Sequence, residues 1–279
     1  MADFFQTNLP YLLAGISVGG QYALIAIGYT MVYGILRLIN FAHGDVFMVA
    51  GLVMIYATAS MPMAVSIPLV IVATVVLGFV IERVAYKPLR SAPRMSVMIS
   101  AIGVSYLLQN CALYFTGGLP QTYPAIPWLS DSVTIGSATT KMVTLITPVL
   151  TLVLVVALVL FIKKTKIGMA MRAVSKDFET SQLMGIKINA VISMTFIIGC
   201  FLAAIGSLPG LKAFVAAVFG GIGSIPGAVI GAFIIGICEN FIKGAGWTAF
   251  SDAFTFVLLI VILMVKPTGI FGEKATDKV

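Results

Sequence analysis

The sequence predicts an all-α membrane protein, a polytopic bundle of about eight to nine transmembrane helices. Of its 279 residues, 60% are hydrophobic and only 10% are charged, whereas about a quarter of the residues of a soluble domain are charged. Apolar runs recur along the whole chain, and most approach the ~20 residues that a helix needs to cross a bilayer. No stretch remains for a soluble domain, so residues 1–279 are predicted to form a single transmembrane domain.

The first predicted span, Leu9–Leu36, is rich in glycine, and its Gly15 and Gly19 form a GxxxG pair that allows close helix packing. We read it as a retained first helix, because no basic region or small-residue cleavage site marks a signal peptide. Pro62 is expected to end the second span. The remaining spans are predicted at Val46–Ala59, Ile67–Ile81, Met95–Phe115, Val143–Ile162, Ala190–Leu208, Ala228–Ile242 and Trp247–Val265.

One apolar run, Leu211–Ile222, is too short to cross the membrane as a helix. At 1.5 Å per residue it would extend about 18 Å, against roughly 30 Å of hydrocarbon. We therefore expect a short or re-entrant segment near 211–222. The glycine-rich stretch Gly220–Gly227 would then form a turn, with Pro226 starting the next helix.

The positive charges predict the orientation. With the N-terminus outside and the C-terminus in the cytoplasm, fourteen of the 17 Lys/Arg residues lie on the cytoplasmic side and three, Lys141, Lys212 and Lys243, lie outside. This is the positive-inside pattern of membrane proteins, and it accounts for the basic balance without nucleic acid. The longest run of charge, within the loop 163–189, is predicted to be cytoplasmic, as is the basic loop Glu82–Arg94. The stretch Thr116–Lys141 is expected to be an external loop.

The polar stretch Asn40–Asp45 interrupts apolar sequence and predicts a broken helix. Inside lipid, only unwound backbone and helix ends can face a polar solute. Asn40, His43 and Gly44 are therefore candidates for lining a transport pathway. The alternative is that His43, the single histidine, caps a helix or makes a local hydrogen bond beside Asp45.

Two acidic residues, Glu239 and Asp252, fall within apolar runs near the predicted outer ends of their helices. Intramembrane carboxylates are candidates for function, including proton coupling. Interfacial pairing is the favoured interpretation, because water or Lys243 can reach both positions.

No pattern predicts an enzyme. The sequence has no GxxxxGK[ST] nucleotide loop and no Ser/His/Asp or HExxH set. Cys111, Cys200 and Cys238 all lie in apolar segments without metal-ligand spacing. We therefore expect no active site, no metal and no cofactor in this chain.

Three motifs carry a resemblance to a known family. They are GISVGGQYALIAIGYTMVYGILRLINFAHGDVFMVAG at 15–51, GMAMRAVSKDFETSQLMGIKIN at 168–189 and GLKAFVAAVFGGIGSIPGAVIGA at 210–232. On these motifs the chain resembles the membrane permease subunit of bacterial ABC importers for branched-chain amino acids, the high-affinity leucine/isoleucine/valine type. The resemblance implies a place in the bacterial inner membrane and a second related permease subunit as partner. It also implies two cytoplasmic ATPase subunits that hydrolyse ATP, a periplasmic or extracellular substrate-binding protein, and contact with membrane lipid.

The resemblance also gives the basic loop a role. Its central part, Gly168 to Gly185, looks like one short coupling helix that docks into a cleft of an ATPase subunit. The match implies contact residues at Gly168, Arg172, Ala173, Asp177 and Gly185. The alternative is a solvated basic loop that only sets topology. In one respect the sequence departs from the family: the outer turn at 204–211 is shorter than the family's usual external stretch.

Other functions remain open at this point. The same architecture serves importers of urea, short amides or other amino acids, and the pairing with a second permease could be homodimeric or heterodimeric. An ion-coupled secondary transporter would need carboxylates near the bilayer centre, and a passive channel would need no partner ATPase.

Overall fold

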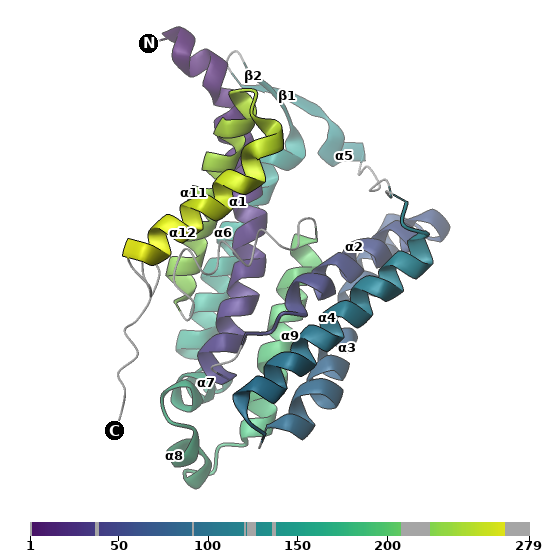
Figure 1. The fold of residues 1–279 in the computed structure, drawn as a ribbon. Helices are drawn as coiled ribbons and strands as arrows, with labels where there is room; N and C mark the ends of the chain where they lie inside the picture. The colour runs from purple at the N-terminus through teal and green to yellow at the C-terminus, as the bar shows by residue number, and fades with distance from the viewer. Residues whose placement is uncertain are drawn as a thin grey trace. The chain divides into compact units, whose positions relative to one another are not determined.

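The computed structural model describes residues 2–36, 39–90, 92–119, 121, 127–135, 138–207 and 224–265. Within these ranges the chain is almost entirely helical (Figure 1). Seven of the helices described are long and apolar enough to cross a membrane, and a shorter apolar helix follows near the C-terminal end. The predicted class, an all-α polytopic bundle, is confirmed. The expected re-entrant segment at 211–222 lies outside the described residues.

The long helices begin and end close to the predicted spans. They are α1 (Ala2–Leu36), α2 (His43–Ser60), α3 (Met63–Ile81), α4 (Arg94–Thr116), α6 (Met142–Lys164), α9 (Ile188–Gly206), α11 (Ile225–Gly244) and α12 (Ser251–Val265). Two of the expected helix boundaries have visible causes. Pro62 is the N-cap of α3, and Pro226 stands in the first turn of α11, where its missing N–H costs nothing.

Short elements connect these helices. A π-helical turn, η1 (Glu82–Tyr86), and a 3₁₀ turn, η2 (Lys87–Leu89), follow α3. Two short helices, α7 (Lys166–Lys176) and α8 (Phe178–Leu183), lie between α6 and α9. The stretch Thr116–Lys141, expected to be an external loop, contains α5 (Pro127–Ser130) and two antiparallel strands, β1 (Ser132–Ile135) and β2 (Ala138–Lys141), with Ser132 opposite Lys141. A last turn, η3 (Thr248–Phe250), precedes α12.

Contacts divide the chain into two compact units, and α1 and α6 contribute to both. The first comprises residues 1–27, 125–155 and 211–279, and the second comprises residues 28–124 and 156–210. In the second unit, α3 packs on α2 and α9, and α2 also packs on α4 and α9. Two buried hydroxyls of this unit return a hydrogen bond to their own helix: Thr74 donates to the Val70 carbonyl at 2.7 Å and Thr195 to the Val191 carbonyl at 2.8 Å. These bonds let polar residues lie in an apolar core at little cost.

In the first unit, α1 and α11 approach each other closely through small residues. A Cβ at Gly236 of α11 would overlap the backbone of Gly15 and Gly19, and a Cβ at Gly19 would come within 2.8 Å of the Phe233 Cα. The GxxxG pair therefore serves helix packing within the chain, as the sequence indicated.

Glu239 of α11 is buried, with 1% of its surface exposed, and it is paired. Lys243, one helical turn later, lies with its Nζ 2.6 Å from Glu239 Oε1, and the Tyr22 hydroxyl donates to Oε2 at 2.8 Å. The expected pairing is present, and the salt bridge offsets the cost of burying the carboxylate. The side chain of Asp252 lies outside the described part of the structure.

Candidate functional site

The predicted break after the first span is present in the second unit. Helix α1 ends at Leu36 and α2 begins at His43. Asn40 shapes the turn between them, since its Oδ1 accepts from the Ala42 N–H at 3.1 Å and its carbonyl accepts from the His43 N–H at 3.1 Å. Asparagine favours such turns because its side chain mimics a backbone acceptor. A second donor, the Tyr86 hydroxyl, reaches the same Oδ1 at 2.7 Å.

His43 fills a slot between two glycines. Its ring is 1% exposed and meets the Tyr29 ring edge-on, with centroids 5.1 Å apart. A Cβ at Gly28 of α1 would overlap the imidazole, and a Cβ at Gly199 of α9 would lie 3.4 Å from Cε1. Helix α2 has no side-chain N-cap hydrogen bond, and the Nε2 of His43 has no hydrogen-bond partner among the described residues. The ring therefore acts chiefly by its shape, holding three helices at a close crossing.

The structure brings the three pathway candidates, Asn40, His43 and Gly44, close together, but all three are buried in the packed interior of the second unit. Asn40 is 2% exposed, His43 is 1% exposed, and Gly44 is buried with its N–H bonded to the Tyr29 hydroxyl at 3.0 Å. Their contact with a solute stays a prediction. The structure shows that they build the start of α2, and thereby place the residues that follow it.

The residues of α2 that follow Gly44 form a polar pair with α4 and line a cavity. Asp45, in the first turn of α2, accepts from Gln109 of α4 at 3.0 Å. A carboxylate is favourable at a helix N-terminus, where backbone N–H groups point outward. Reasoning from sequence did not pair these two residues. The available signal was that each is a polar side chain within apolar sequence, a pattern that often marks a functional position.

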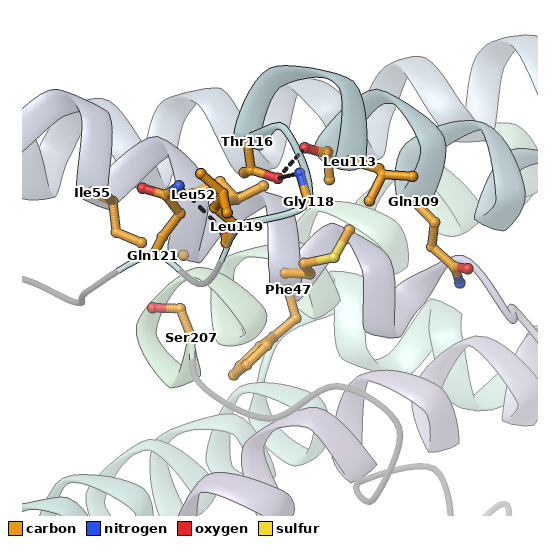
Figure 2. Close-up of a pocket in the computed structure, with 13 residues that line it drawn as sticks. Phe47, Leu52, Ile55, Gln109, Leu113, Thr116, Gly118, Leu119, Gln121 and Ser207 are labelled. Carbon is orange, nitrogen blue, oxygen red and sulfur yellow. Dashed lines mark hydrogen bonds between the residues drawn. The ribbon is translucent and has the colours of Figure 1, made fainter.

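A cavity of about 560 Å³ lies beside this pair within the second unit. Figure 2 shows its lining: α2 contributes apolar residues from Phe47 to Ile55, α4 contributes its C-terminal half, and Ser207 closes the end of α9. The segment after α4 is tied down by hydrogen bonds, including one from the Gly118 N–H to the Leu113 carbonyl at 3.2 Å. Apolar walls with a few polar groups, Gln109, Thr116, Gln121 and Ser207, suit a small solute with an aliphatic part.

The basic loop forms two helices where the sequence indicated one. Thr165 caps α7 by accepting from the Gly168 N–H at 3.0 Å, and Met171 and Val174 are buried beneath it. Asp177 ends α7 and caps α8, because its Oδ1 accepts from the Thr180 N–H at 3.0 Å. The expectation of one helix over Gly168–Gly185 is therefore corrected: the stretch contains two helices, which meet at Asp177. Its coupling role stays a prediction.

The predicted contact residues of this loop have distinct places. Gly168 is buried, and a Cβ there would overlap the Ile162 backbone, so it permits α7 to fold back on α6. Arg172 is exposed and donates to the Lys163 carbonyl at 3.2 Å, whereas Ala173 is half-buried. Gly185 has φ +82° and closes α8, the left-handed conformation that glycine adopts without strain.

The tip of the loop carries an apolar surface that reasoning from sequence did not separate from the rest. Leu183 is 87% exposed and Met184 is 78% exposed, next to basic sequence that is expected to lie in water. Figure 1 shows α7 and α8 at the end of α9, outside the helices of that unit. Large apolar side chains so exposed in a polar setting mark an interaction surface.

Among the described residues, no cluster of three or more His, Cys, Asp or Glu side chains could hold a metal ion. The three cysteines are free thiols. The described residues thus show a break between α1 and α2, a cavity of about 560 Å³ and an exposed apolar tip at Leu183 and Met184.

Comparison with known proteins decides the family. The family model described as branched-chain amino acid transport system, permease component, matches residues 11–263. The chain belongs to this family. Its members are permease components of transport systems rather than enzymes, which agrees with the polytopic membrane architecture.

Several curated permeases are similar over their full length. The chain is 38% identical to the high-affinity branched-chain amino acid transport system permease protein LivH of Escherichia coli strain K12, with all of both chains covered. It is 40% identical to the corresponding BraD of Pseudomonas aeruginosa, over 97% of this chain and 98% of that protein. A probable permease of Methanocaldococcus jannaschii is 25% identical over 89% of this chain and 88% of that protein. No solved structure matches the chain significantly.

The comparison also bears on length. The alignment with the Escherichia coli permease spans 308 positions, whereas the present chain has 279 residues. At least 29 aligned positions therefore have no residue in the present chain. The sequence led us to expect a shorter gap, of about fifteen to twenty residues, at one outer turn. The place proposed for the shortening, 204–211, is described only as far as Ser207.

Proposed function

We propose that this chain is the permease subunit of an ATP-driven importer and forms half of a transmembrane pathway for branched-chain amino acids. Membership of the permease family supports the transport role, and the names of the full-length relatives support the solute class. The cavity beside Asp45 and Gln109 supports a small solute with an aliphatic side chain. The same architecture with urea, short amides or other amino acids as solute is the second candidate.

The observation that carries the coupling to ATP is the α7–α8 pair. The chain has no GxxxxGK[ST] nucleotide-binding loop of its own, so in an ATP-driven importer the ATP is hydrolysed by a partner. The exposed Leu183 and Met184 form an apolar tip, and the caps at Thr165 and Asp177 hold both helices in a defined conformation. A surface that is apolar, exposed and rigid can bind an ATPase subunit and receive a rigid-body displacement from it.

The proposed assembly is the one that membership of the family implies. Two cytoplasmic ATPase subunits bind and hydrolyse ATP, a second related permease completes the pathway, and an external binding protein delivers the solute. This chain then spans the bacterial inner membrane with its N-terminus outside and both its C-terminus and residues 163–189 in the cytoplasm, as the distribution of Lys and Arg supports.

The test places a charge on the apolar tip. Leu183→Glu and Met184→Glu should abolish co-purification of the ATPase subunits and reduce ATP-dependent uptake at least tenfold, because a carboxylate resists transfer into an apolar contact. Gln182→Glu is the matched control, since it adds the same charge one residue earlier on the same exposed helix. If both tip variants retained wild-type assembly and uptake, the docking role would be refuted.

The rival classes separate in the same vesicles. An importer driven by ATP stops when ATP is depleted and tolerates a protonophore, whereas an ion-coupled secondary transporter shows the reverse. A passive channel only equilibrates the solute across the membrane.

A further inference from the structure

A fully buried carboxylate lies at the end of α3, in the same turn as Tyr86. Glu82, the first residue of the π-helical turn η1, is 0% exposed. Both of its oxygens are bonded: Arg90 forms a salt bridge with Oε1, and the Ser193 hydroxyl of α9 donates to Oε2 at 2.9 Å. A buried charge is tolerated only when it is paired in a defined geometry, so Glu82 holds its neighbours in defined places.

Arg90 extends this pairing to the start of α9. One terminal nitrogen of its guanidinium bonds Glu82, and the other bonds the side-chain oxygen of Asn189, the second residue of α9. The planar guanidinium presents its donors in a fixed fork, which makes the position of one partner depend on that of the other. We call Glu82, Arg90, Asn189 and Ser193 the α9 clamp.

The α9 clamp stands directly after the proposed docking helices. Four residues separate α8 from α9, and they are bonded at both ends: the Ile186 N–H donates to the Ser181 carbonyl at 3.1 Å, and the Lys187 carbonyl accepts from the Ala190 N–H at 2.9 Å. Helix α7 also packs on α9. A displacement of α7 and α8 therefore reaches the first turn of α9 through short, hydrogen-bonded backbone.

On its other side the clamp leads to the helix break. Tyr86, the last residue of η1, is 2% exposed, its hydroxyl bonds Asn40 at 2.7 Å, and its ring packs on Phe196 of α9 with centroids 5.1 Å apart. Asn40 in turn forms the turn that starts α2, the helix that lines the 560 Å³ cavity. The contacts thus run without interruption from the docking helices to the cavity wall.

The surroundings leave room for movement. A second cavity, of about 470 Å³, is lined by Tyr86 and Arg90 on one side and by residues of α7 and α8, among them Val174 and Phe178, on the other. π-Helical turns occur frequently at functional sites, because their inserted residue interrupts the regular helical ladder. A closely packed, regular helix at this place would resist displacement.

We propose that the α9 clamp and Tyr86 are positioning residues that deliver a displacement of α7 and α8 to the α1–α2 break. This inference rests on the proposed function. Its distinct content is that Asn189 and Tyr86, which lie outside the lining of the 560 Å³ cavity, set how much uptake results from each ATP hydrolysed.

The experiment uses the complete transporter reconstituted in vesicles, with uptake and ATP hydrolysis measured on the same preparation. Asn189→Ala removes the acceptor of Arg90 at an exposed position while leaving the Glu82–Arg90 pair intact. Tyr86→Phe removes only the hydroxyl that reaches Asn40. Each variant should lower uptake per ATP hydrolysed about threefold to tenfold, and Asn189→Asp, which keeps an acceptor oxygen, should restore the ratio. Asn110→Ala is the control, because that exposed amide bonds the Tyr106 carbonyl within its own helix at 2.7 Å and should leave the ratio unchanged.

The outcomes are distinguishable. A fall in the ratio with normal assembly, reversed by Asn189→Asp, supports the clamp as a transmission device. An unchanged ratio, or a loss of uptake that only parallels a loss of assembled transporter, overturns it and leaves the proposed function standing. If the wild-type assembly showed no solute-dependent ATP hydrolysis at all, the proposed function itself would fail, and the clamp proposal with it.

Discussion

The close crossing at His43 leads to a prediction about a single methyl group. Replacing Gly28 by Ala would make the new Cβ overlap the His43 imidazole, whose Nε2, Cε1 and Cδ2 are the nearest atoms. Non-bonded carbon atoms pack best at a separation of about 3.5 Å or more. The ring has little space to retreat, because Tyr29 and Gly199 confine it on other sides. We expect Gly28→Ala to lower the free energy of unfolding by about 1–3 kcal/mol, the range for overpacking a buried site.

The same helix offers a matched control. Gly34, also in α1, has no atom within 4 Å of an added Cβ. Gly34→Ala should therefore be neutral or stabilising by up to ~1 kcal/mol, since alanine loses less backbone entropy than glycine in a helix. The two substitutions are chemically identical, so a difference between them measures the crossing alone.

A double variant identifies the cause. His43→Ala alone should destabilise, because it leaves a hole and removes an aromatic contact worth about 0.5–1.5 kcal/mol. In that background Gly28→Ala should cost almost nothing, which gives a coupling energy of about 1–3 kcal/mol between the two sites. Thermal unfolding in mild detergent can be followed as the increase in reaction with a thiol-reactive dye above that of the exposed Cys111 and the half-buried Cys238, because Cys200 is buried until the helices separate. Equal effects of Gly28→Ala and Gly34→Ala, or strict additivity in the double variant, would refute the reasoning.

Two further predictions concern the first unit. Gly236→Ala should destabilise the protein by about 1–3 kcal/mol, because its Cβ would overlap the backbone of α1, which cannot rotate away as a side chain can. Gly103→Ala is the control, since no atom lies within 4 Å of a Cβ there. Equal melting temperatures of the two variants would contradict the close approach of α1 and α11. Lys243→Met should destabilise the protein by about 1–3 kcal/mol, because it leaves the carboxylate of Glu239 buried without its cation. The loss is expected to be smaller than for a fully buried pair, because Lys243 is partly exposed to water. The double variant Glu239→Gln with Lys243→Met should recover much of that loss in the same melting assay, and a double variant as unstable as Lys243→Met alone would show that the charge is not the cause.

Much of the fold was predictable because hydropathy and length decide which segments can span a bilayer. The predicted spans from Leu9–Leu36 to Trp247–Val265 each correspond to a described helix, apart from the short run at 211–222, which lies outside the described residues. Local pairs were predictable for a similar reason. Glu239 and Lys243 are one helical turn apart, so their pairing follows from helix geometry alone.

Long-range contacts were not predictable in this way. The basic loop Glu82–Arg94 was predicted to be cytoplasmic from its charge, but its Glu82 is buried and bonded to a residue 111 positions away. Nothing in the local pattern distinguishes such a carboxylate from a solvated one. Likewise the break between α7 and α8 depends on the side chain of Asp177 bonding the backbone ahead of it, which competes with helix continuation.

The sequence by itself determined the class of the molecule, its spans and the presence of a helix break at Asn40–Asp45, because these depend on the cost of exposing polar groups to lipid. Its motifs also indicated the family, which the comparisons confirmed. Only the tertiary structure decided what the break is made of: His43 in a slot of two glycines from α1 and α9, and Asn40 held by Tyr86. Those contacts depend on how three helices cross, and the crossing is set by which side chains fit together at a distance along the chain.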